Sequence, residues 1–361
     1  MIKVAVDVMG GDYAPAETVR GCAEAVNKDP DVFVYAVGKE DEIRAVLSGV
    51  SYDASRLEII HASEVVEMAE SPVAAIRAKK DSSMLVGMKL VRDGAADGFV
   101  CAGNTGAVLV GGQTVIGRLK GVQRAPLAML IPTEKGVSLL LDCGANVDAR
   151  PDHLVSWARM GSVYYETMVG KKSPTVALVS IGTEEEKGNA LVKETGPLLK
   201  ECKDINYTGY IESREIPAGG ADVIVCEAFT GNVILKLDEG MAKTMLKIIK
   251  GGLMSSLRGK IGGLLIKKPL KETLKTFDAS SYGGAPMLGL KGLVVKTHGN
   301  STYKEICNSI LQCAEYKRSG ADEKIRELES ARPYRQLPTA FSFLDRRDFV
   351  VLADTDNSIR K

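Results

Sequence analysis

The stretch VAVDVMGGD, residues 4–12, shows the unit from which the fold is built. An apolar run rich in valine ends in a Gly-Gly-Asp turn, and a helical pattern then continues to about Val26. The same order of strand, Gly/Asn/Thr/Asp loop and helix begins five more times, at about residues 98, 138, 176, 222 and 293. Strands that alternate with helices form βαβ units, so we predict an α/β fold with one mostly parallel sheet and helices on both of its faces.

The six loops that follow these strands are the main functional signal in the sequence. Ligands of parallel sheets bind at the carboxyl ends of the strands, and we expect all the loops at that one edge. Backbone amides at helix starts bind anions, so several such loops favour a phosphate site, although turn chemistry alone would explain any single loop. The residues expected to contact the substrates are Gly10, Gly11, Asp12, Asn104, Thr105, Gly106, Asn146, Gly188, Asn189, Thr230, Gly231 and His298.

Composition excludes several classes of protein. The chain has 361 residues, 45% of them hydrophobic, which rules out disorder as the whole answer. Lys and Arg number 47 against 46 Asp and Glu, so a basic nucleic-acid coat is not expected. Seven cysteines without a CxxC pair and only three histidines argue against a zinc site. We therefore expect no metal, no cofactor, no nucleic-acid partner and reduced thiols in a cytoplasmic protein.

Neither a signal peptide nor a membrane span is expected. The apolar run at residues 1–8 is broken by Asp7 and is too short for a signal-peptide core. Residues 98–117 carry no charge and have the length of a membrane span, but they contain six glycines. A strand, a turn and a buried helix explain this stretch better.

Two loop residues are candidates for chemistry. Lys187 can balance a bound phosphate or a developing oxyanion, although it follows three glutamates and a solvated charge run has the same pattern. Asn232 can donate its amide to a reacting oxygen or cap the helix that begins near it, and taken alone it favours the cap. The chain contains neither a Gly-x-Gly nor a GxxxxGK[ST] motif, so a dinucleotide fold and a P-loop NTPase are not expected.

Residues 243–275 form a basic amphipathic segment in a neutral chain. Apolar residues recur there at steps of three and four, which predicts one apolar face of a helix. Several glycines favour a hairpin or tip, and Pro269 is expected to end the helix. Such a segment is typical of a membrane surface or an acidic partner, although a core helix with a basic outer face fits the same pattern. The residues expected at this contact are Leu253, Leu257, Lys260, Ile261, Leu264, Leu265, Lys267, Lys268 and Lys271.

A series of motifs points to a known family. They are DVMGGDYAP (7–15), AIRAKKDSSM (75–84), AGNTGA (102–107), LDCGANVD (141–148), GTE (182–184), KGN (187–189), FTGNV (229–233), YGGA (282–285) and HG (298–299). In this order, over about residues 1–316, they resemble the bacterial phosphate acyltransferases (acyl-acyl-carrier-protein:phosphate transacylases) of phospholipid synthesis.

The resemblance implies an enzyme that moves a fatty acyl group from acyl carrier protein to inorganic phosphate. It implies a fold like that of phosphotransacetylases and isocitrate-type dehydrogenases, a homodimer, and catalytic roles for Lys187 and Asn232. It also places residues 240–280 in a protruding helical segment linked to dimerisation and to peripheral attachment at the inner face of the cell membrane. The acyltransferase domain would span residues 1–330. The family pattern fades after about Arg332, and residues 331–361 form a tail of unknown role.

The implied chemistry agrees with the residues, and the alternatives can be separated. Phosphate can attack a thioester directly, so no cysteine nucleophile is needed, and the enzyme has to align the reactants and stabilise an oxyanion. The nearest alternative is a phosphotransacetylase that uses acyl-coenzyme A. A dehydrogenase of related fold would need a nicotinamide site and a metal site. A non-enzymatic membrane scaffold would explain the basic segment but not the loops.

Overall fold

The structure, a computed structural model, describes residues 1–275 and 282–330, so the predictions for the tail at residues 331–361 lie outside the described residues. The α/β prediction is confirmed. The first sheet runs in the order β10 (Ala285–Met287), β11 (Leu293–Lys296), β4 (Gly98–Cys101), β1 (Ile2–Asp7), β2 (Val32–Gly38) and β3 (Leu57–His61). The second runs in the order β5 (Ala128–Thr133), β6 (Gly136–Leu141), β9 (Val223–Val225), β7 (Thr175–Val179) and β8 (Asn206–Ile211).

The expectation of a single sheet is wrong. The loops after β1, β4 and β11 follow strands of the first sheet, and the loops after β6, β7 and β9 follow strands of the second. Within each sheet the pairs are parallel except β10–β11 and β5–β6. Each strand–loop–helix unit looks alike locally, whereas the partner of a strand is decided by contacts far along the chain, such as Asp7 beside Cys101 and Leu141 beside Val225.

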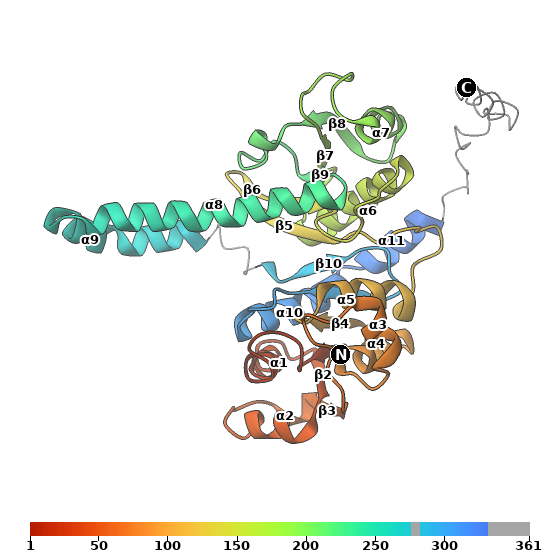
Figure 1. Cartoon of the computed structure of the whole chain (residues 1–361), viewed down its shortest axis with the longest axis vertical. Helices are drawn as coiled ribbons and strands as arrows, with labels where there is room; N and C mark the ends of the chain where they lie inside the picture. The colour runs from red at the N-terminus through yellow and green to blue at the C-terminus, as the bar shows by residue number, and fades with distance from the viewer. Residues whose placement is uncertain (276–281, 331–361) are drawn as a thin grey trace, which may run out of the picture.

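Helices cover both faces of the first sheet (Figure 1). Side chains alternate along β1, so Val4 and Val6 share one core cluster with α1 (Ala16–Lys28) and α10 (Tyr303–Arg318). Ala5 points the other way and packs in a second cluster with α4 (Ser83–Arg92). The remaining helices of this half are α2 (Glu40–Leu47), α3 (Pro72–Ala78) and α5 (Thr105–Gly111), with a π-helix over Gly112–Ile116.

The second sheet is covered in the same way. Leu139 and Leu141 of β6 pack with α6 (Pro151–Val169) and α7 (Ala190–Glu201), and α6 begins at Pro151. Leu140 faces the opposite side, where it packs with Leu235 of α8 (Ala228–Met254). Short 3-10 helices at Ala54–Arg56 and Ser213–Glu215 complete the loops.

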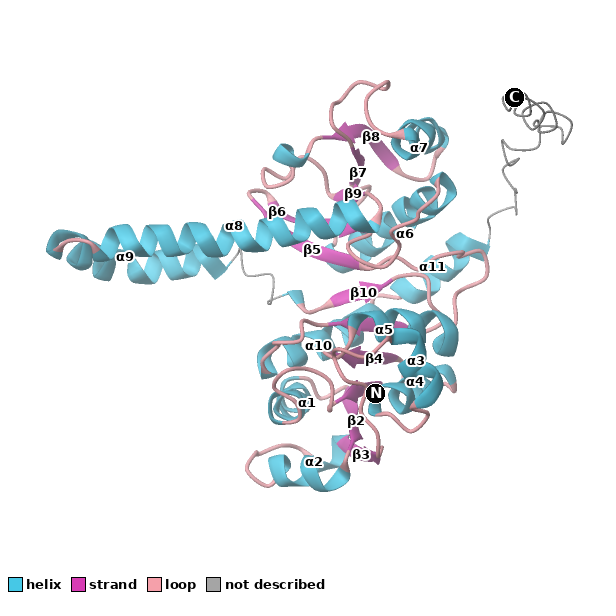
Figure 2. Ribbon diagram, in the orientation of Figure 1, coloured by secondary structure: helices cyan, strands magenta, loops and turns pink. Residues whose placement is uncertain are grey.

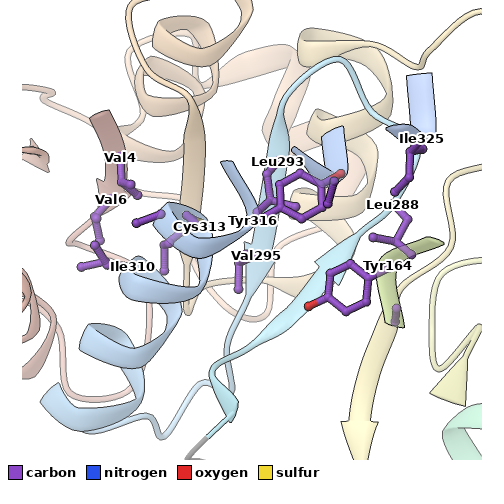
Figure 3. Packing of buried hydrophobic residues seen from close by; sticks show 14 of the residues in the cluster. Val4, Val6, Tyr164, Leu288, Leu293, Val295, Ile310, Cys313, Tyr316 and Ile325 are labelled. Atoms are coloured by element: carbon purple, nitrogen blue, oxygen red, sulfur yellow. The ribbon is translucent and has the colours of Figure 1, made fainter. Parts of the chain in front are cut away.

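One core cluster joins the two halves. Tyr164 of α6 lies against Tyr316 of α10, with ring centroids 6.1 Å apart, and its hydroxyl accepts a hydrogen bond of 3.1 Å from Gln312. Figure 3 shows Tyr164 beside Leu288 and the side chains of the first half. Helix α11 (Ala321–Ser330) packs on α6, and the Leu288 amide donates to the Pro126 carbonyl. The two sheets are therefore packed as one body.

Helix α8 extends away from the body and returns as α9 (Leu257–Lys275), as Figure 2 shows. The predicted hairpin is present, with its turn at Ser255 and Ser256, but Pro269 lies inside α9 and does not end it. The apolar side chains of α9 are exposed, Leu257 and Leu265 each at 76%, so the alternative of a core helix is wrong for the single chain. Among the described helices, none has the length and apolarity needed to cross a membrane.

Candidate active site

The loops after β1 and β4 are held together by a buried carboxylate. Asp7, the last residue of β1, accepts hydrogen bonds from the Ser83 hydroxyl at 2.6 Å, the Met9 amide at 3.1 Å and the Cys101 thiol at 3.1 Å. Burial raises the pKa of Asp7, although its donors oppose that change. Gly10 is required because a Cβ there would lie 2.6 Å from the carboxylate of Asp7.

The loop after β11 joins this cluster. Lys296, the last residue of β11, is 6% exposed, and its ammonium donates to the carbonyls of Ala102 and Thr297. Burial lowers the pKa of Lys296. The Asp12 amide donates to the Gly299 carbonyl at 2.7 Å, so Asp12 and the exposed His298 lie in adjoining loops. The carboxyl ends of β1, β4 and β11 thus form one loop cluster.

A second buried carboxylate organises the loop after β6. Asp142 accepts from the amides of Leu127, Gly144, Ala145 and Asn146 and from the Asn146 side chain, at 2.7–3.1 Å. Burial raises its pKa despite these donors. The backbone of α8 approaches closely, because a methyl group at Gly231 would overlap the carbonyl oxygen of Asp142.

Helix α8 begins earlier than the sequence suggests. Its cap is Glu227, whose carboxylate accepts from the Phe229 amide at 2.6 Å and the Thr230 amide at 3.0 Å. The alternative that Asn232 caps this helix is therefore wrong, because the helix already starts at Ala228. Asn232 is an exposed residue of the second turn, and its side chain has no capping role to perform.

Lys187 lies in the exposed bend between β7 and α7. Behind it, Gly188 has a φ of 97°, and Asn189 caps α7 by accepting from the Val192 amide at 3.0 Å. Strands β7 and β9 are parallel neighbours, so Lys187 and Asn232 follow the carboxyl ends of adjacent strands. The side chain of Lys187 extends from this bend as an exposed cation.

An ion-paired junction links the two loop clusters. Glu239 of α8 contacts His298 at 3.1 Å through one carboxylate oxygen and Lys236 at 3.1 Å through the other. The contact with His298 lowers the pKa of Glu239 to about 2. Sequence reasoning missed Lys236 and Glu239, which lie four and seven residues after Asn232 and so share one face of a helix that begins at Ala228.

Several predicted contact residues serve the loops themselves. The side-chain amide of Asn104 donates to the carbonyls of Glu67, Met68 and Glu70, and its oxygen caps α5. Asn146 donates to Asp142 and to the Ala125 carbonyl. The other predicted positions lie in or beside the same loops: Gly10, Gly11, Asp12, Thr105, Gly106, Gly188, Asn189, Thr230, Gly231 and His298. Sequence reasoning also missed the carboxylates of Asp7 and Asp142, although both stand inside its motifs.

The cysteines that border the loop clusters are buried. No group of three or more His, Cys, Asp and Glu side chains in the described part of the chain is placed to hold a metal ion. Cys101, Cys143 and Cys226 border the loop clusters, and burial raises the pKa of each thiol well above its usual range. A thiolate nucleophile at these positions is therefore disfavoured.

Comparison with known proteins decides the family. The family described as "Fatty acid synthesis protein" matches residues 2–324. The phosphate acyltransferase of Clostridium tetani is 43% identical over 326 residues, which is 90% of this chain and 97% of that protein. The phosphate acyltransferase of Alkaliphilus oremlandii is 46% identical over the same shares of the two chains.

The chain belongs to the phosphate acyltransferase family. It is therefore an enzyme, an acyltransferase, and the resemblance seen in the sequence is confirmed. A phosphotransacetylase from Streptococcus pyogenes matches the structure with a TM-score of 0.58 and 18% identity, over 88% of this chain and 94% of that one. At that identity the likeness concerns the fold alone, and it confirms the expected phosphotransacetylase-like fold.

Proposed function

We propose that this phosphate acyltransferase transfers a fatty acyl group from acyl carrier protein to inorganic phosphate, giving acyl phosphate for phospholipid synthesis. The observation that carries the proposal is the position of Lys187 and Asn232 at the carboxyl ends of the adjacent strands β7 and β9, in a member of this family. Ligands of parallel sheets bind at that edge, and an exposed cation and an exposed amide suit a phosphate and an oxyanion.

The reaction is a direct displacement. An oxygen of phosphate forms a bond to the thioester carbonyl carbon, and the carbonyl oxygen becomes an oxyanion. The oxyanion then re-forms the carbonyl as the C–S bond breaks, and the carrier thiolate leaves and takes the proton that hydrogen phosphate gives up. Lys187 balances the charge of phosphate or of the oxyanion, and the Asn232 amide donates to the reacting oxygen. The buried thiols of Cys101, Cys143 and Cys226 take no part.

The acyl donor is tested by mixing the protein with phosphate and either palmitoyl-acyl carrier protein or palmitoyl-coenzyme A, and trapping acyl phosphate with hydroxylamine. We expect a product with the carrier protein that depends on phosphate. The phosphotransacetylase-like fold keeps acyl-coenzyme A as the second candidate donor. A product from the coenzyme A thioester alone would refute the carrier protein as donor, and no product from either would refute the activity.

Asn232 offers a test of the mechanism in which stability and activity separate. Because Glu227 already caps α8 and Asn232 is exposed, Asn232→Ala should leave thermal stability nearly unchanged and abolish turnover. Asn232→Asp keeps the size of the side chain but places a negative charge beside two anions, and it should also be inactive. An active Asp variant would show that the amide does not donate to a reacting oxygen.

The hairpin of α8 and α9 is proposed as the contact with the membrane and the carrier protein, and the enzyme as a peripheral protein of the inner membrane face. Supporting this, Leu257, Ile261, Leu264 and Leu265 are exposed, and Leu253 is half-buried beside them. Lys260, Lys267 and Lys268 are also exposed. Each lysine near an anionic membrane surface contributes about 1 kcal/mol to binding. The side chain of Lys271 lies outside the described residues.

A further inference from the structure

The hydrogen bonds that the loop amides already make limit where an anion can bind. The Asp7 carboxylate accepts a hydrogen bond from the Met9 amide. The Asp142 carboxylate accepts from three loop amides, and the Glu227 carboxylate accepts from two amides at the start of α8. These backbone donors are therefore not free to hold phosphate. Cationic side chains at this edge can supply the charge-assisted hydrogen bonds that these amides do not.

One cationic side chain, Lys236, lies on the face of α8 that carries Asn232. Asn232, Lys236 and Glu239 are spaced by four and three residues, which aligns them on that face, and neighbours at this spacing have Cβ atoms about 5–6 Å apart. Lys236 and His298 are each about half exposed, whereas Glu239 between them is only 26% exposed. The carboxylate is thus the most buried of the three groups, and the Lys236 ammonium and the His298 imidazole lie on its solvent side.

Further charged groups lie near this junction. Lys296 lies close enough that the charge of Lys236 adds to burial in lowering the Lys296 pKa. Asp12 is near the same lysine. Glu239 holds Lys236, from the second half of the molecule, against His298, from the first, so it fixes the distance between groups that the chain otherwise places far apart.

We propose that Lys236 binds phosphate together with His298, beside Asn232, and that Glu239 is the positioning residue that holds the two in register across the halves of the molecule. This inference rests on the proposed function, because phosphate is the anion that the reaction requires. Substrate contact was expected only for His298 among these three residues. Orientation by Glu239 keeps both donors aimed at one anion without loss of side-chain freedom when phosphate arrives.

The test measures KM for phosphate and for the acyl donor separately, on the full chain. Lys236→Met should raise the phosphate KM roughly 10- to 100-fold, the range for a lost hydrogen bond to a charged group, while Lys236→Arg stays near wild type. Glu239→Gln can hold only one of its two partners, so it should raise the phosphate KM about tenfold. The KM for the acyl donor should change little in any of these variants.

A matched control is Glu42→Gln in α2, which breaks another Lys–Glu pair with the same spacing, Lys39–Glu42 at 3.3 Å, and should change neither KM. An unchanged phosphate KM in Lys236→Met would overturn the proposal. The proposal would also be overturned if Glu239→Gln lowered the melting temperature and turnover but left both KM values unchanged. That result would show that Glu239 has only a structural role.

Failure of the proposed donor is distinguishable from failure of this inference. Inorganic phosphate alone should raise the melting temperature of the wild-type protein, and this shift should be lost in Lys236→Met and kept in Lys236→Arg. The measurement needs no acyl donor, so it holds whichever thioester the enzyme uses. A phosphate-dependent shift of full size in Lys236→Met would place the anion elsewhere. If Lys236→Met does not fold, Lys236→Gln is measured in its place.

Discussion

Three carboxylates shape the loops at the strand ends. Asp7, Asp142 and Glu227 each follow or end a strand and accept hydrogen bonds from the backbone that comes next. These carboxylates accept the backbone hydrogen bonds that a bound anion would otherwise accept. These amides are therefore already paired before substrate arrives, and we expect side chains such as Lys187 to balance the charge of phosphate.

The first residue-scale prediction concerns Lys187. Lys187→Ala should lower turnover by roughly 10²–10³, the effect of losing one preorganised donor at an oxyanion. The melting temperature should not move, because the side chain extends from an exposed bend. Steady-state kinetics beside thermal melts check this, with Lys193→Ala, an exposed lysine in the first turns of α7, as the matched control. Wild-type turnover in folded Lys187→Ala would remove the residue from the mechanism.

The second residue-scale prediction compares two glycines of α8. At Gly231 a methyl group would overlap the Asp142 carbonyl, so Gly231→Ala should cost about 1–3 kcal/mol of stability as an overpacked site and displace the helix that carries Asn232. At Gly240 nothing lies within 4 Å, so Gly240→Ala should add up to about 1 kcal/mol through helix propensity alone. Urea unfolding measures both changes, and equal effects of the two substitutions would contradict the close approach of α8 to β6.

Among the helices and strands, those that local sequence signals mark could be predicted. Pro151 marks the start of α6 because proline is tolerated in the first turn of a helix, and valine-rich runs mark β1 and β11. The start of α8 was misplaced because Asn232 is the better capping residue by type, whereas Glu227 performs the role. The division into two sheets and the contact of Glu239 with His298 depend on which distant segments pair. The hydrophobic periodicity of a sequence holds no information about that pairing.

The element-scale prediction concerns the tip of the hairpin. Leu257→Glu with Ile261→Glu should release the protein from anionic vesicles, because both apolar side chains are exposed and available to enter a membrane interface. Melting temperature and activity in a soluble assay should stay near wild type. Val73→Glu with Val169→Glu adds the same charge at exposed valines of the body and should leave vesicle binding intact. Co-sedimentation of the folded Leu257/Ile261 variant with vesicles would show that the tip is not the membrane contact.

At the scale of the whole molecule, the packed body and the hairpin differ in what they bury. The core that joins the two sheets through Tyr164 and Tyr316 needs no partner. Helix α8 instead leaves a row of apolar side chains exposed, at spacings of mostly four residues: Phe229, Val233, Leu237, Met241, Met245 and Ile248. At 1.5 Å per residue this row is roughly 30 Å long, and soluble monomers rarely expose a continuous apolar surface of that extent.

The row predicts that two copies of the chain associate along α8. A second copy of the same helix would cover it by an isologous contact, as in most homodimers. Sedimentation analysis should therefore find a dimer, and Leu237→Glu with Ile248→Glu should convert it to a monomer of unchanged helix content. Lys243→Glu with Lys250→Glu changes charge on another face of the same helix and should leave the dimer in place. A wild-type monomer, or a dimer that survives glutamates at these two positions of the row, would show that α8 is not the interface. Because the row begins at Phe229, within one turn of Asn232, loss of the dimer should also alter turnover even in variants whose loops are untouched.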